Sequence, residues 1–548
     1  MFGLMYDPMQ AFADLLDRLV FTPSRNGKLR LMADYFRTAP DPDRGYALAA
    51  MTGDLDIPAV KPAMIRALMD GRMDPELFAL SYDYVGDLAE TVSLVWPESH
   101  GANRTPPLSE IVETLSDATR AEAMKLVAGW LDSLDATGRW AFLKLLTGGL
   151  RIGVSARLTK LALAQYGGKP VTGIEEIWHG LAPPYESLFA WLEDRAERPA
   201  PDMAAPFRPV MLAHPLVPKA DRDSPDAVDP TLITAETFAA EWKYDGIRVQ
   251  ASAERGARRI YTRTGDDISH AFPDVVAAMA FEGTLDGELL VRNPGGGVAP
   301  FNALQQRLNR KTVSKRQMET HPAFIRAYDV LQDGACDLRG QAFRDRRNRL
   351  ERFIADIGSD RFDLSPLVPI TTLAALDDAR LDPPAPEIEG VMLKRWDSPY
   401  LAGRPKGFWY KWKRDPFLID AVLMYAQRGH GKRSSFYSDF TFGVWRDEDG
   451  EDRLAPVGKA YFGFTDDELK QLDAFVRTHT IDRFGPVRSV TANKQTGIVL
   501  EVAFEGLQRS PRHKSGLAMR FPRINRIRWD KPTAEADRIE TLEALLPD

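Results

Sequence analysis

The stretch Glu241-Trp-Lys-Tyr-Asp-Gly-Ile-Arg248 carries the strongest chemical signal in the sequence. Side chains alternate between the two faces of a β-strand, so Glu241, Lys243 and Asp245 are expected to share one face. Gly246 permits a tight turn of the chain against a bound ligand. A lysine among acids on a surface strand is commonly only a solvated ion pair. The function of this stretch can therefore be inferred only together with the segments that follow it.

A lysine acts as a nucleophile only after it has lost its proton. With an ordinary pKa near 10.4, only about one lysine in two thousand is neutral at pH 7. Nearby cations favour the neutral form. Lys411 and Lys413 alternate in Trp409-Tyr-Lys-Trp-Lys-Arg414, so their ammonium groups share one face. Both are candidates to favour a neutral Lys243 and to bind a nucleotide phosphate as point charges.

Two other strand-like stretches, Leu285–Val291 and Glu389–Lys394, each place a carboxylate among apolar residues. An unpaired buried carboxylate is costly, so Glu288 and Glu389 are expected to meet a cation. Magnesium prefers a few carboxylates together with phosphate oxygens and water, which makes these two residues candidate metal ligands. A buried arginine or lysine partner is the alternative.

Helical periodicity marks the first two hundred residues. Apolar residues recur at the i, i+3, i+4, i+7 spacing of one helix face at Phe12, Leu15, Leu16 and Leu19. Further along, Gly148 and Gly149 interrupt the pattern beside Arg151, where backbone amides can approach a phosphate. A plain junction between two helices fits the same residues. Eight prolines between positions 199 and 230 then predict a linker.

Short strands bounded by Gly, Pro and Asp follow the linker. They are expected at 241–252, 259–264, 284–292, 325–331, 389–395 and 408–413. A third region begins near residue 415, with strands expected at 418–426, 439–445, 458–464, 497–505 and 520–529. One helix is expected there at 466–478, because Thr465 and Glu468 have the spacing of a capping box. Five strands and one helix are typical of a small closed barrel such as an OB-fold.

Composition limits the classes of protein. A chain of 548 residues is too long for one hydrophobic core, and its only cysteine, Cys336, excludes an internal disulfide or a multi-cysteine zinc site. The net charge of −7 argues against a uniformly basic nucleic-acid binder. Residues 301–316, however, include five basic side chains and no acidic one, as expected where a polyanion lies along one surface. Solvated surface charge is the alternative for such a run. No run of eighteen apolar residues and no signal pattern occurs, which predicts a cytoplasmic protein without membrane contact.

Six segments resemble, in order, the motifs of the nucleotidyltransferase superfamily of ATP-dependent DNA ligases, RNA ligases and mRNA capping enzymes. They are KYDGIR (243–248), YTRTGDDIS (261–269), LDGELLVR (285–292), AYDVL (327–331), EGVMLKR (389–395) and WYKWKRD (409–415). A single KxDG arises often by chance, whereas six motifs in order are specific.

The resemblance implies roles for the matching residues. Lys243 would be the site of AMP attachment. The implied nucleotide-binding residues are Glu241 at the adenine, Arg248 and Arg263 at the ribose and phosphate, Glu288 and Glu389 at the ribose hydroxyl and the metal, Tyr328 stacked on the purine, and Lys394, Lys411 and Lys413 at the phosphates. The last barrel motif would add Arg520, Arg523 and Asp530-Lys531 at the pyrophosphate. The family often has Phe where Tyr328 stands, and either ring offers a π face.

The flanking segments resemble the larger ATP-dependent DNA ligases. They are LLTGGLRIGVSARLTKLAL (145–163) and FRPVMLAHP (207–215) upstream, and RGHGKR (428–433), LEVAF (500–504) and LAMRFPRINRIRWDK (517–531) downstream. The implied plan is a helical DNA-binding domain (1–200), an α+β nucleotidyltransferase domain of the ATP-grasp-like ligase kind (201–414), an OB-fold β-barrel (415–531) and a C-terminal tail (532–548). Residues 414–416 would form the hinge of the barrel.

The expected protein is thus a compact bacterial DNA ligase that uses ATP with Mg²⁺, or with Mn²⁺, to seal nicked double-stranded DNA. It is expected to be a monomer and to be cytoplasmic and nucleoid-associated. The candidates for contact with DNA are Arg151, Arg307, Arg310 and Lys311. Two alternatives remain at this point: an RNA ligase of the same superfamily, and a non-catalytic nucleic-acid binder that kept the fold.

Overall fold

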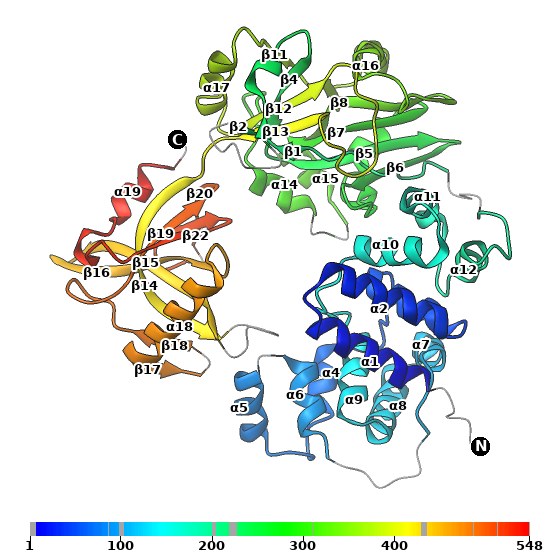
Figure 1. Cartoon of the computed structure of the whole chain (residues 1–548), viewed down its shortest axis with the longest axis vertical. Coiled ribbons are helices and arrows are strands. Elements are labelled where there is room, and N and C mark those ends of the chain that lie inside the picture. The colour runs from blue at the N-terminus through cyan, green and yellow to red at the C-terminus, as the bar shows by residue number, and fades with distance from the viewer. Residues whose placement is uncertain are drawn as a thin grey trace. The chain divides into compact units, whose positions relative to one another are not determined.

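The computed structural model describes residues 7–85, 87–97, 104–199, 204–218, 227–308, 310, 312–428, 436–485, 487–511 and 513–546 (Figure 1). Internal contacts divide the chain into two units. One unit comprises Lys169–Ala182 and Asp194–Asp415, and the other comprises Met1–Gly168, Pro183–Glu193 and Pro416–Asp548. Among the described residues, no helix is long and apolar enough to cross a membrane.

The described N-terminal region is helical. Its α-helices are α1 (Pro8–Phe21), α2 (Arg25–Thr38), α3 (Asp43–Thr52), α4 (Pro62–Ala67), α5 (Pro75–Val85), α6 (Leu88–Val95), α7 (Leu108–Asp117), α8 (Arg120–Ser133), α9 (Ala136–Thr147), α10 (Ala156–Gly167) and α12 (Glu186–Leu192). The periodicity predicted for the first helix is confirmed, because Phe12, Leu15, Leu16 and Leu19 are all buried. Most of these helices form because they bury an apolar stripe against their neighbours, whereas α5 leaves Leu77 and Leu80 exposed.

Two mixed sheets form the middle unit. The first has the strand order β1 (His214–Pro215), β13 (Trp409–Lys413), β12 (Ile388–Arg395), β4 (Phe238–Tyr244), β11 (Leu367–Val368). The second has the order β10 (Phe362–Leu364), β8 (Ala323–Asp333), β7 (Gly283–Val291), β5 (Ile247–Glu254), β6 (Ala257–Thr262), with β9 (Cys336–Asp337) paired to β8. A separate two-stranded sheet joins β2 (Val217–Pro218) and β3 (Ala227–Val228).

Helices of this unit are α11 (Val171–Ile177), α13 (Pro273–Ala277), α14 (Phe301–Leu308), α15 (Lys315–Thr320), α16 (Phe343–Ile357) and α17 (Leu373–Leu381). Leu350 and Phe353 of α16 pack into the apolar core on one face of the second sheet. A separate apolar core covers one face of the first sheet. The remaining faces of the two sheets carry the polar side chains discussed below.

The single strand predicted at 241–252 is wrong. The chain leaves the first sheet after Tyr244, turns at Asp245 and Gly246, and enters the second sheet as β5. A Cβ atom at Gly246 would lie 2.6 Å from the carbonyl oxygen of Leu289, so only glycine fits this crossing without a shift of the backbone. The crossing connects the two polar sheet faces directly after Lys243.

The predicted linker at 199–230 is also partly wrong. Residues 204–216 pack against the middle unit, where Phe207, Val210 and Met211 are buried. Met211 forms an isolated bridge with Gly403, and His214 pairs with Tyr410 on β13. Prolines here rigidify a packed strand-like segment rather than a free connection.

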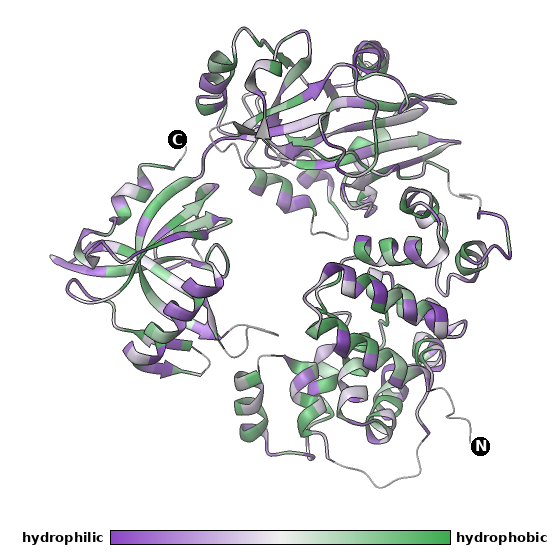
Figure 2. Cartoon of the chain, in the orientation of Figure 1, coloured by the Kyte–Doolittle hydropathy of each residue, from purple (hydrophilic) through white to green (hydrophobic). Residues whose placement is uncertain are grey.

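The C-terminal region is strand-rich. A seven-stranded sheet contains β14 (Phe417–Arg428), β15 (Tyr437–Glu448), β16 (Glu451–Ala460), β17 (Thr480–Phe484), β18 (Val487–Val490), β19 (Val499–Phe504) and β22 (Arg523–Arg528), while β20 (Gly506–Arg509) pairs with β21 (Leu517–Arg520). The capping box predicted at Thr465 and Glu468 is confirmed at the start of α18 (Asp466–His479). In Figure 2, α18 carries both hydrophilic and hydrophobic residues, as expected for a helix that covers one side of a core.

The segment after residue 531 is not a separate tail. Helix α19 (Ile539–Glu543) places Ile539 and Leu542 in the same hydrophobic cluster as the strands. The indole N–H of Trp445 donates to the carbonyl of Thr533, and Asp537 accepts a hydrogen bond from the backbone N–H of Asp420. This segment therefore completes the C-terminal core, contrary to the boundary predicted from the sequence.

Truncation of a single side chain tests this packing. Leu542→Ala removes a fully buried side chain and leaves a cavity, so the C-terminal region should lose about 2–5 kcal/mol of unfolding free energy. Glu543→Ala on the same helix is exposed and should change it by less than about 0.5 kcal/mol. Chemical denaturation followed by tryptophan fluorescence measures both variants, and equal stability for the two would contradict the packing of α19.

Candidate active site

One face of the first sheet gathers the cationic residues predicted from the sequence. In the strand register, Lys243 of β4 lies opposite Gly390, and Gly390 lies opposite Lys413 of β13. Alternation then places Glu241, Lys243, Lys394, Lys411 and Lys413 on one face. The other face carries the apolar residues of the first core. The expected shared face of Glu241 and Lys243 is confirmed, whereas Asp245 lies beyond the end of the strand.

A β-bulge brings Glu389 to Lys243. The register of β12 against β4 shifts between Ile388 and Gly390, so Glu389 is the extra residue of the bulge. Its carboxylate accepts a hydrogen bond from Lys243 Nζ at 2.5 Å and lies 3.3 Å from Lys413 Nζ. Although burial would raise it, the two lysines hold the pKa of Glu389 below its ordinary value.

The polar face of the second sheet supplies the other acids. Arg248 of β5 lies opposite Glu288 of β7. The guanidinium of Arg248 donates to both carboxylate oxygens of Asp286, at 3.1 and 2.7 Å, and to the carbonyl of Met211 at 2.7 Å. The hydroxyl of Tyr400 donates to Asp286 at 2.6 Å. Arg248 is thus held by Asp286. The alternative of an arginine or lysine partner applies to Glu389, which pairs with Lys243 and Lys413.

In the described part of the chain, Arg248 lies opposite Glu288 in the strand register but forms its ion pair with Asp286. Burial raises the pKa of Glu288 to about 7, and the neighbouring charges of Glu389 and Asp286 act in the same direction, while Lys243 and Arg248 oppose them. The charge of Glu389 thus disfavours ionisation of Glu288. An additional cation between two such carboxylates would favour their charged forms.

The stability of protein stripped of divalent cations should report on Glu288. The folded state retains a proton that the unfolded state, with an ordinary pKa of 4.5, has released. The contribution of this proton to the free energy of unfolding is complete below the unfolded pKa and is lost as pH rises through the folded pKa of Glu288. The melting temperature of the wild type should therefore fall relative to that of Glu288→Gln between about pH 5 and about pH 8. A difference in melting temperature between the two proteins that stays constant with pH would contradict the raised pKa of Glu288.

Tyr328 and Lys394 lie between the two sheets. Lys394 Nζ donates to the backbone carbonyl of Tyr328 at 3.1 Å and lies 4.3 Å from the centre of its ring. Burial lowers the pKa of Lys394, and the nearby Glu241 opposes that change. Lys394 is only 2% exposed, so its ammonium is directed to protein groups. The structure does not present it as a free phosphate ligand.

Glu241 binds protein groups through its side chain. Its carboxylate is buried, 2.6 Å from Lys394 Nζ, and accepts a hydrogen bond from Arg347 of α16 at 3.1 Å. Two cations therefore occupy the two carboxylate oxygens. The contact of Glu241 with adenine stays a prediction.

The remaining cations cluster around Lys411. Burial lowers the pKa of Lys411, and the charges of Lys413, Lys243, Arg404 and Arg263 add to the effect. Arg263 is exposed on the turn that follows β6. Arg404 lies on the loop before β13, where its carbonyl contacts His214 at 3.2 Å. Arg404 was not among the predicted residues, because the loop that carries it has no periodic pattern.

The predicted DNA contacts have different outcomes. The prediction that Arg307 contacts DNA is wrong. Arg307 is fully buried, ion-paired with Asp274, and donates to the carbonyls of Ala271 and His321. Arg310 is exposed, and Lys311 lies outside the described residues. Arg151 is exposed in a left-handed conformation with φ 47°, on the loop between α9 and α10.

That loop has a defined anchor. Lys28 of α2 is buried and donates to the carbonyls of Ile152 and Gly153, at 3.0 and 2.9 Å. Gly153 has φ 66°, and a Cβ atom there would lie 2.6 Å from Lys28 Nζ. The glycine is therefore needed for this local anchor. Arg520, the last predicted ligand of the nucleotide, ends β21 in the C-terminal region and is half-buried.

A divalent cation fits the acids of the site. Among the described residues, no group of three or more His, Cys, Asp or Glu side chains is arranged to hold a metal. Glu288 and Glu389 therefore provide two carboxylates without a further protein ligand of this kind. Mg²⁺ commonly binds through one or two carboxylates and completes its shell with water and substrate phosphates. The metal itself stays a prediction.

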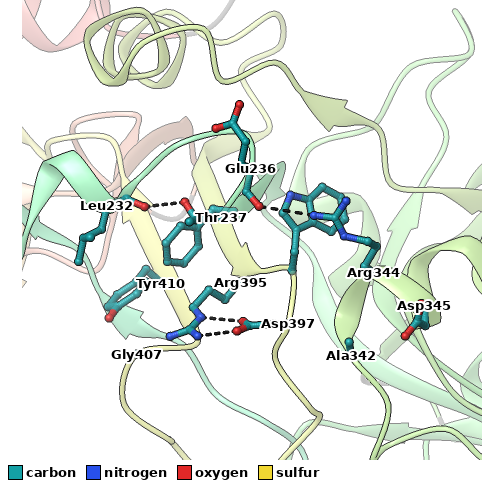
Figure 3. Close-up of a pocket in the computed structure, with 12 residues that line it drawn as sticks. Leu232, Glu236, Thr237, Ala342, Arg344, Asp345, Arg395, Asp397, Gly407 and Tyr410 are labelled. Carbon is teal, nitrogen blue, oxygen red and sulfur yellow. Dashed lines mark hydrogen bonds and ion pairs between the residues drawn. The ribbon is translucent and has the colours of Figure 1, made fainter.

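A separate pocket of about 490 Å³ lies at the other end of β4 and β12 (Figure 3). Phe238 lines it, and five residues of extended strand place Lys243 about 16 Å away. Figure 3 shows Arg395 and Asp397 facing each other, with contacts of 2.7 and 2.6 Å. Arg344 donates to the carbonyl of Glu236 at 3.4 Å. These polar groups bind each other, and none of the predicted site residues lines this pocket.

Known protein families match the two parts of the chain that surround and follow this site. The family model described as ATP dependent DNA ligase domain matches residues 223–413, and the model described as ATP dependent DNA ligase C terminal region matches 433–531. Together they cover more than half of the chain. The chain belongs to the ATP-dependent DNA ligase family.

Relatives of this ligase extend over its full length. A "Probable DNA ligase" of Anaeromyxobacter dehalogenans is 30% identical, over 97% of this chain and 98% of the relative. A "DNA ligase 1" of Korarchaeum cryptofilum is 29% identical over 98% of both. A "Probable DNA ligase" of Koribacter versatilis is 28% identical over 98% of this chain and 96% of the relative.

The solved structure named Pmar-Lig_PreS3 shares the fold of the ligase, with a TM-score of 0.57 and 15% identity over 94% of this chain and 99% of that one. The resemblance inferred from six motifs is thus confirmed at the level of the family. These relatives favour a DNA ligase over the alternative of an RNA ligase. The family uses ATP, so the predicted nucleotide is confirmed as well.

Proposed function

We propose that this ligase seals nicks with a 5′-phosphate and a 3′-hydroxyl in duplex DNA, through AMP bound covalently to Lys243. The observation that carries the proposal is the bulge that holds Glu389 against Lys243 Nζ, beside Lys413. A lysine in this position is surrounded by further cations and faces the acids of the second sheet. This arrangement suits a nucleophile that attacks a polyphosphate.

In the first step, neutral Lys243 Nζ attacks the α-phosphorus of ATP. A P–N bond forms, the bond from the α-phosphorus to the bridging oxygen breaks, and pyrophosphate leaves. Glu389 Oε2 accepts the hydrogen bond of Nζ and is placed to receive its proton. Lys411, Lys413 and Arg263 bind the departing phosphates, because point charges stabilise the charge that develops there.

In the second step, the 5′-phosphate of the nick attacks the lysyl-AMP phosphorus, and the P–N bond breaks. In the third step, the 3′-hydroxyl attacks the 5′-phosphorus, a phosphodiester bond forms, and AMP leaves. Tyr328 offers its ring to the purine throughout. Glu288 and Glu389 would hold Mg²⁺, or Mn²⁺, which when bound supplies positive charge to the reacting phosphate oxygens.

Lys394, Glu241 and Arg248 serve this site indirectly. Glu241 and Lys394 pair with each other, and Arg248 pairs with Asp286, so each orients the residues that contact the nucleotide. We assign residues 1–200 to DNA binding, 201–414 to nucleotide transfer, and the C-terminal region from 415 to an OB-fold. Residues 414–416 are the hinge, and Arg520, Arg523 and Asp530-Lys531 act on the pyrophosphate in the first step.

The protein acts as a monomer in the cytoplasm, associated with the nucleoid. Binding to DNA relies mainly on phosphates, because a nick occurs at any sequence. Arg151 and Arg310 are the exposed candidates for these contacts.

Charge reversal tests the DNA contacts separately from the chemistry. Arg151→Glu and Arg310→Glu should each weaken binding of a nicked duplex. Each should also reduce by about one the slope of the logarithm of the binding constant against the logarithm of salt concentration. Lys243 should still be adenylated by ATP in both variants. Arg352→Glu, an exposed position on α16, is the matched control. Unchanged slopes in the two variants would show that Arg151 and Arg310 do not contact DNA.

Substrate preference tests the function itself. The wild type should seal a nicked DNA duplex at least about tenfold faster than a nicked RNA duplex of the same sequence, since discrimination by one or two good contacts is worth about 1–3 kcal/mol. Faster sealing of RNA would restore the RNA-ligase alternative.

A further inference from the structure

Two consecutive arginines near the start of α16 point into the protein. Arg346 is fully buried, and the Arg347 side chain is 4% exposed. Charged side chains are seldom buried unless they are paired. Neither arginine belongs to the six motifs, and each binds a strand of a different sheet.

Arg346 holds the second sheet. Its guanidinium donates to both carboxylate oxygens of Asp329 on β8, at 2.8 and 2.9 Å, and Asp329 is fully buried. It also donates to the carbonyl of Ser398, at 3.0 Å, in the loop that follows β12. Asp329 directly follows Tyr328, so this pair fixes the backbone that carries the purine-stacking ring.

Arg347 holds the first sheet. It donates to Glu241 at 3.1 Å and to Glu351 of its own helix at 3.1 Å. Glu241 also lies 2.6 Å from Lys394 Nζ, and Lys394 donates to the carbonyl of Tyr328. The three side chains of Glu241, Lys394 and Arg347 therefore form a buried triad that spans from α16 through β4 to β12.

The triad adjoins the nucleophile. Glu241 lies two residues before Lys243 on the same strand and the same face, so the position of its carboxylate sets the position of β4. Lys243 in turn must reach both Glu389 and the α-phosphorus. An error of about 1 Å in such a placement costs about a hundredfold in rate.

We propose that Arg347 is a positioning residue for the transfer of AMP to Lys243. This inference rests on the proposed role of Lys243. Arg347 neutralises the Glu241 oxygen that Lys394 does not reach, and so keeps the carboxylate buried and β4 in place. Without its guanidinium, that oxygen is buried and unpaired, and Glu241 must move or recruit another proton donor. Either response displaces Lys243 while leaving the exposed phosphate-binding lysines intact.

The experiment compares Arg347→Met with Arg347→Lys, which have similar length but differ in charge. Single-turnover formation of the lysyl-AMP is followed over a range of ATP concentrations. The methionine variant should lower the maximal rate about 30- to 100-fold, and the ATP concentration for half-maximal rate should change by less than about threefold. The maximal rate of the lysine variant should be at least about tenfold higher than that of the methionine variant, because lysine restores a charged donor to Glu241. Arg352→Met, exposed on the same helix, should match the wild type.

A second variant guards against loss of folding. Glu241→Gln keeps the shape of the side chain and removes the charge that Arg347 binds, so it should slow the maximal rate at least about tenfold. Adding Arg347→Met to it should cost less than the same change costs in the wild type, because the two residues act as a pair.

The opposite results are equally clear. A maximal rate within about threefold of wild type in Arg347→Met, or equal losses in the methionine and lysine variants, would overturn the proposal. If Arg347→Met does not fold, a rate within about threefold of wild type in Glu241→Gln would overturn it. Failure of the wild type to form lysyl-AMP would instead overturn the proposed role of Lys243.

Discussion

Lys243→Ala should lose all ATP-dependent nick sealing. The methyl group cannot form a P–N bond, so no AMP reaches the 5′-phosphate of the nick, and no other described lysine has the contact with Glu389 at 2.5 Å that Lys243 makes. A gel assay with a labelled nicked duplex and ATP measures the loss, which should reach the detection limit.

The same variant should still join a nick that already carries AMP on its 5′-phosphate. That last step uses the 3′-hydroxyl as its nucleophile and does not form the lysyl bond. Sealing of the adenylated nick in Lys243→Ala, without ATP, is therefore the matched control for folding and DNA binding. Residual ATP-dependent sealing would show that another group carries the AMP.

Arg346→Met should strongly destabilise the middle unit. Arg346 and Asp329 are both fully buried, and removal of the arginine leaves an uncompensated buried carboxylate. Breaking such a pair costs about 3–5 kcal/mol, which for a unit of this size lowers the melting temperature by about 6–20 °C. Differential scanning calorimetry without nucleotide measures the change.

The double variant Arg346→Met/Asp329→Asn separates the pair from the packing. It removes both charges, so it should melt at a higher temperature than Arg346→Met alone. Arg352→Met on the exposed side of α16 should change the unfolding free energy by less than about 0.5 kcal/mol. A melting temperature for Arg346→Met within about 2 °C of the wild type would show that the buried pair is not required.

The sequence predicted those parts of the fold that depend on local pattern. The helix from Pro8 to Phe21 and the capping box at Thr465 follow from periodicity and hydrogen bonding within a few residues. The strand predicted at 241–252 failed because alternation continues through the turn at Gly246, while the change of sheet depends on distant partners. The prediction of a C-terminal tail at 532–548 was wrong for the same reason, since the apolar residues there are few and their burial depends on the strands they meet.

The site was predicted unevenly. Lys243, Glu389 and Lys413 were predicted from residue type, local pattern and the resemblance to the ligase motifs, and the structure brings them together. The bulge that turns Glu389 toward Lys243 left no sequence signal beyond Gly390, whose φ of 146° a side chain rarely adopts. Arg307 failed because a basic run says nothing about which member is buried against an acid such as Asp274.

Arg346 and Arg347 illustrate a further limit. In the sequence they belong to the highly charged stretch Phe343–Ile357, which has the pattern of a solvent-exposed helix face. Their burial became evident only from the acids on β4 and β8 that receive them. Residues that support a site from behind are therefore hard to find from pattern, because their partners lie far away in sequence.

Intact mass of the purified protein after incubation with ATP and Mg²⁺ tests the central claim most directly. The wild type should gain the mass of one AMP, Lys243→Ala should gain none, and nicked duplex DNA should discharge the adduct. A wild type that gains no AMP, and carries none that pyrophosphate removes, would contradict the lysyl-AMP mechanism; an adduct that persists in Lys243→Ala would contradict the choice of Lys243.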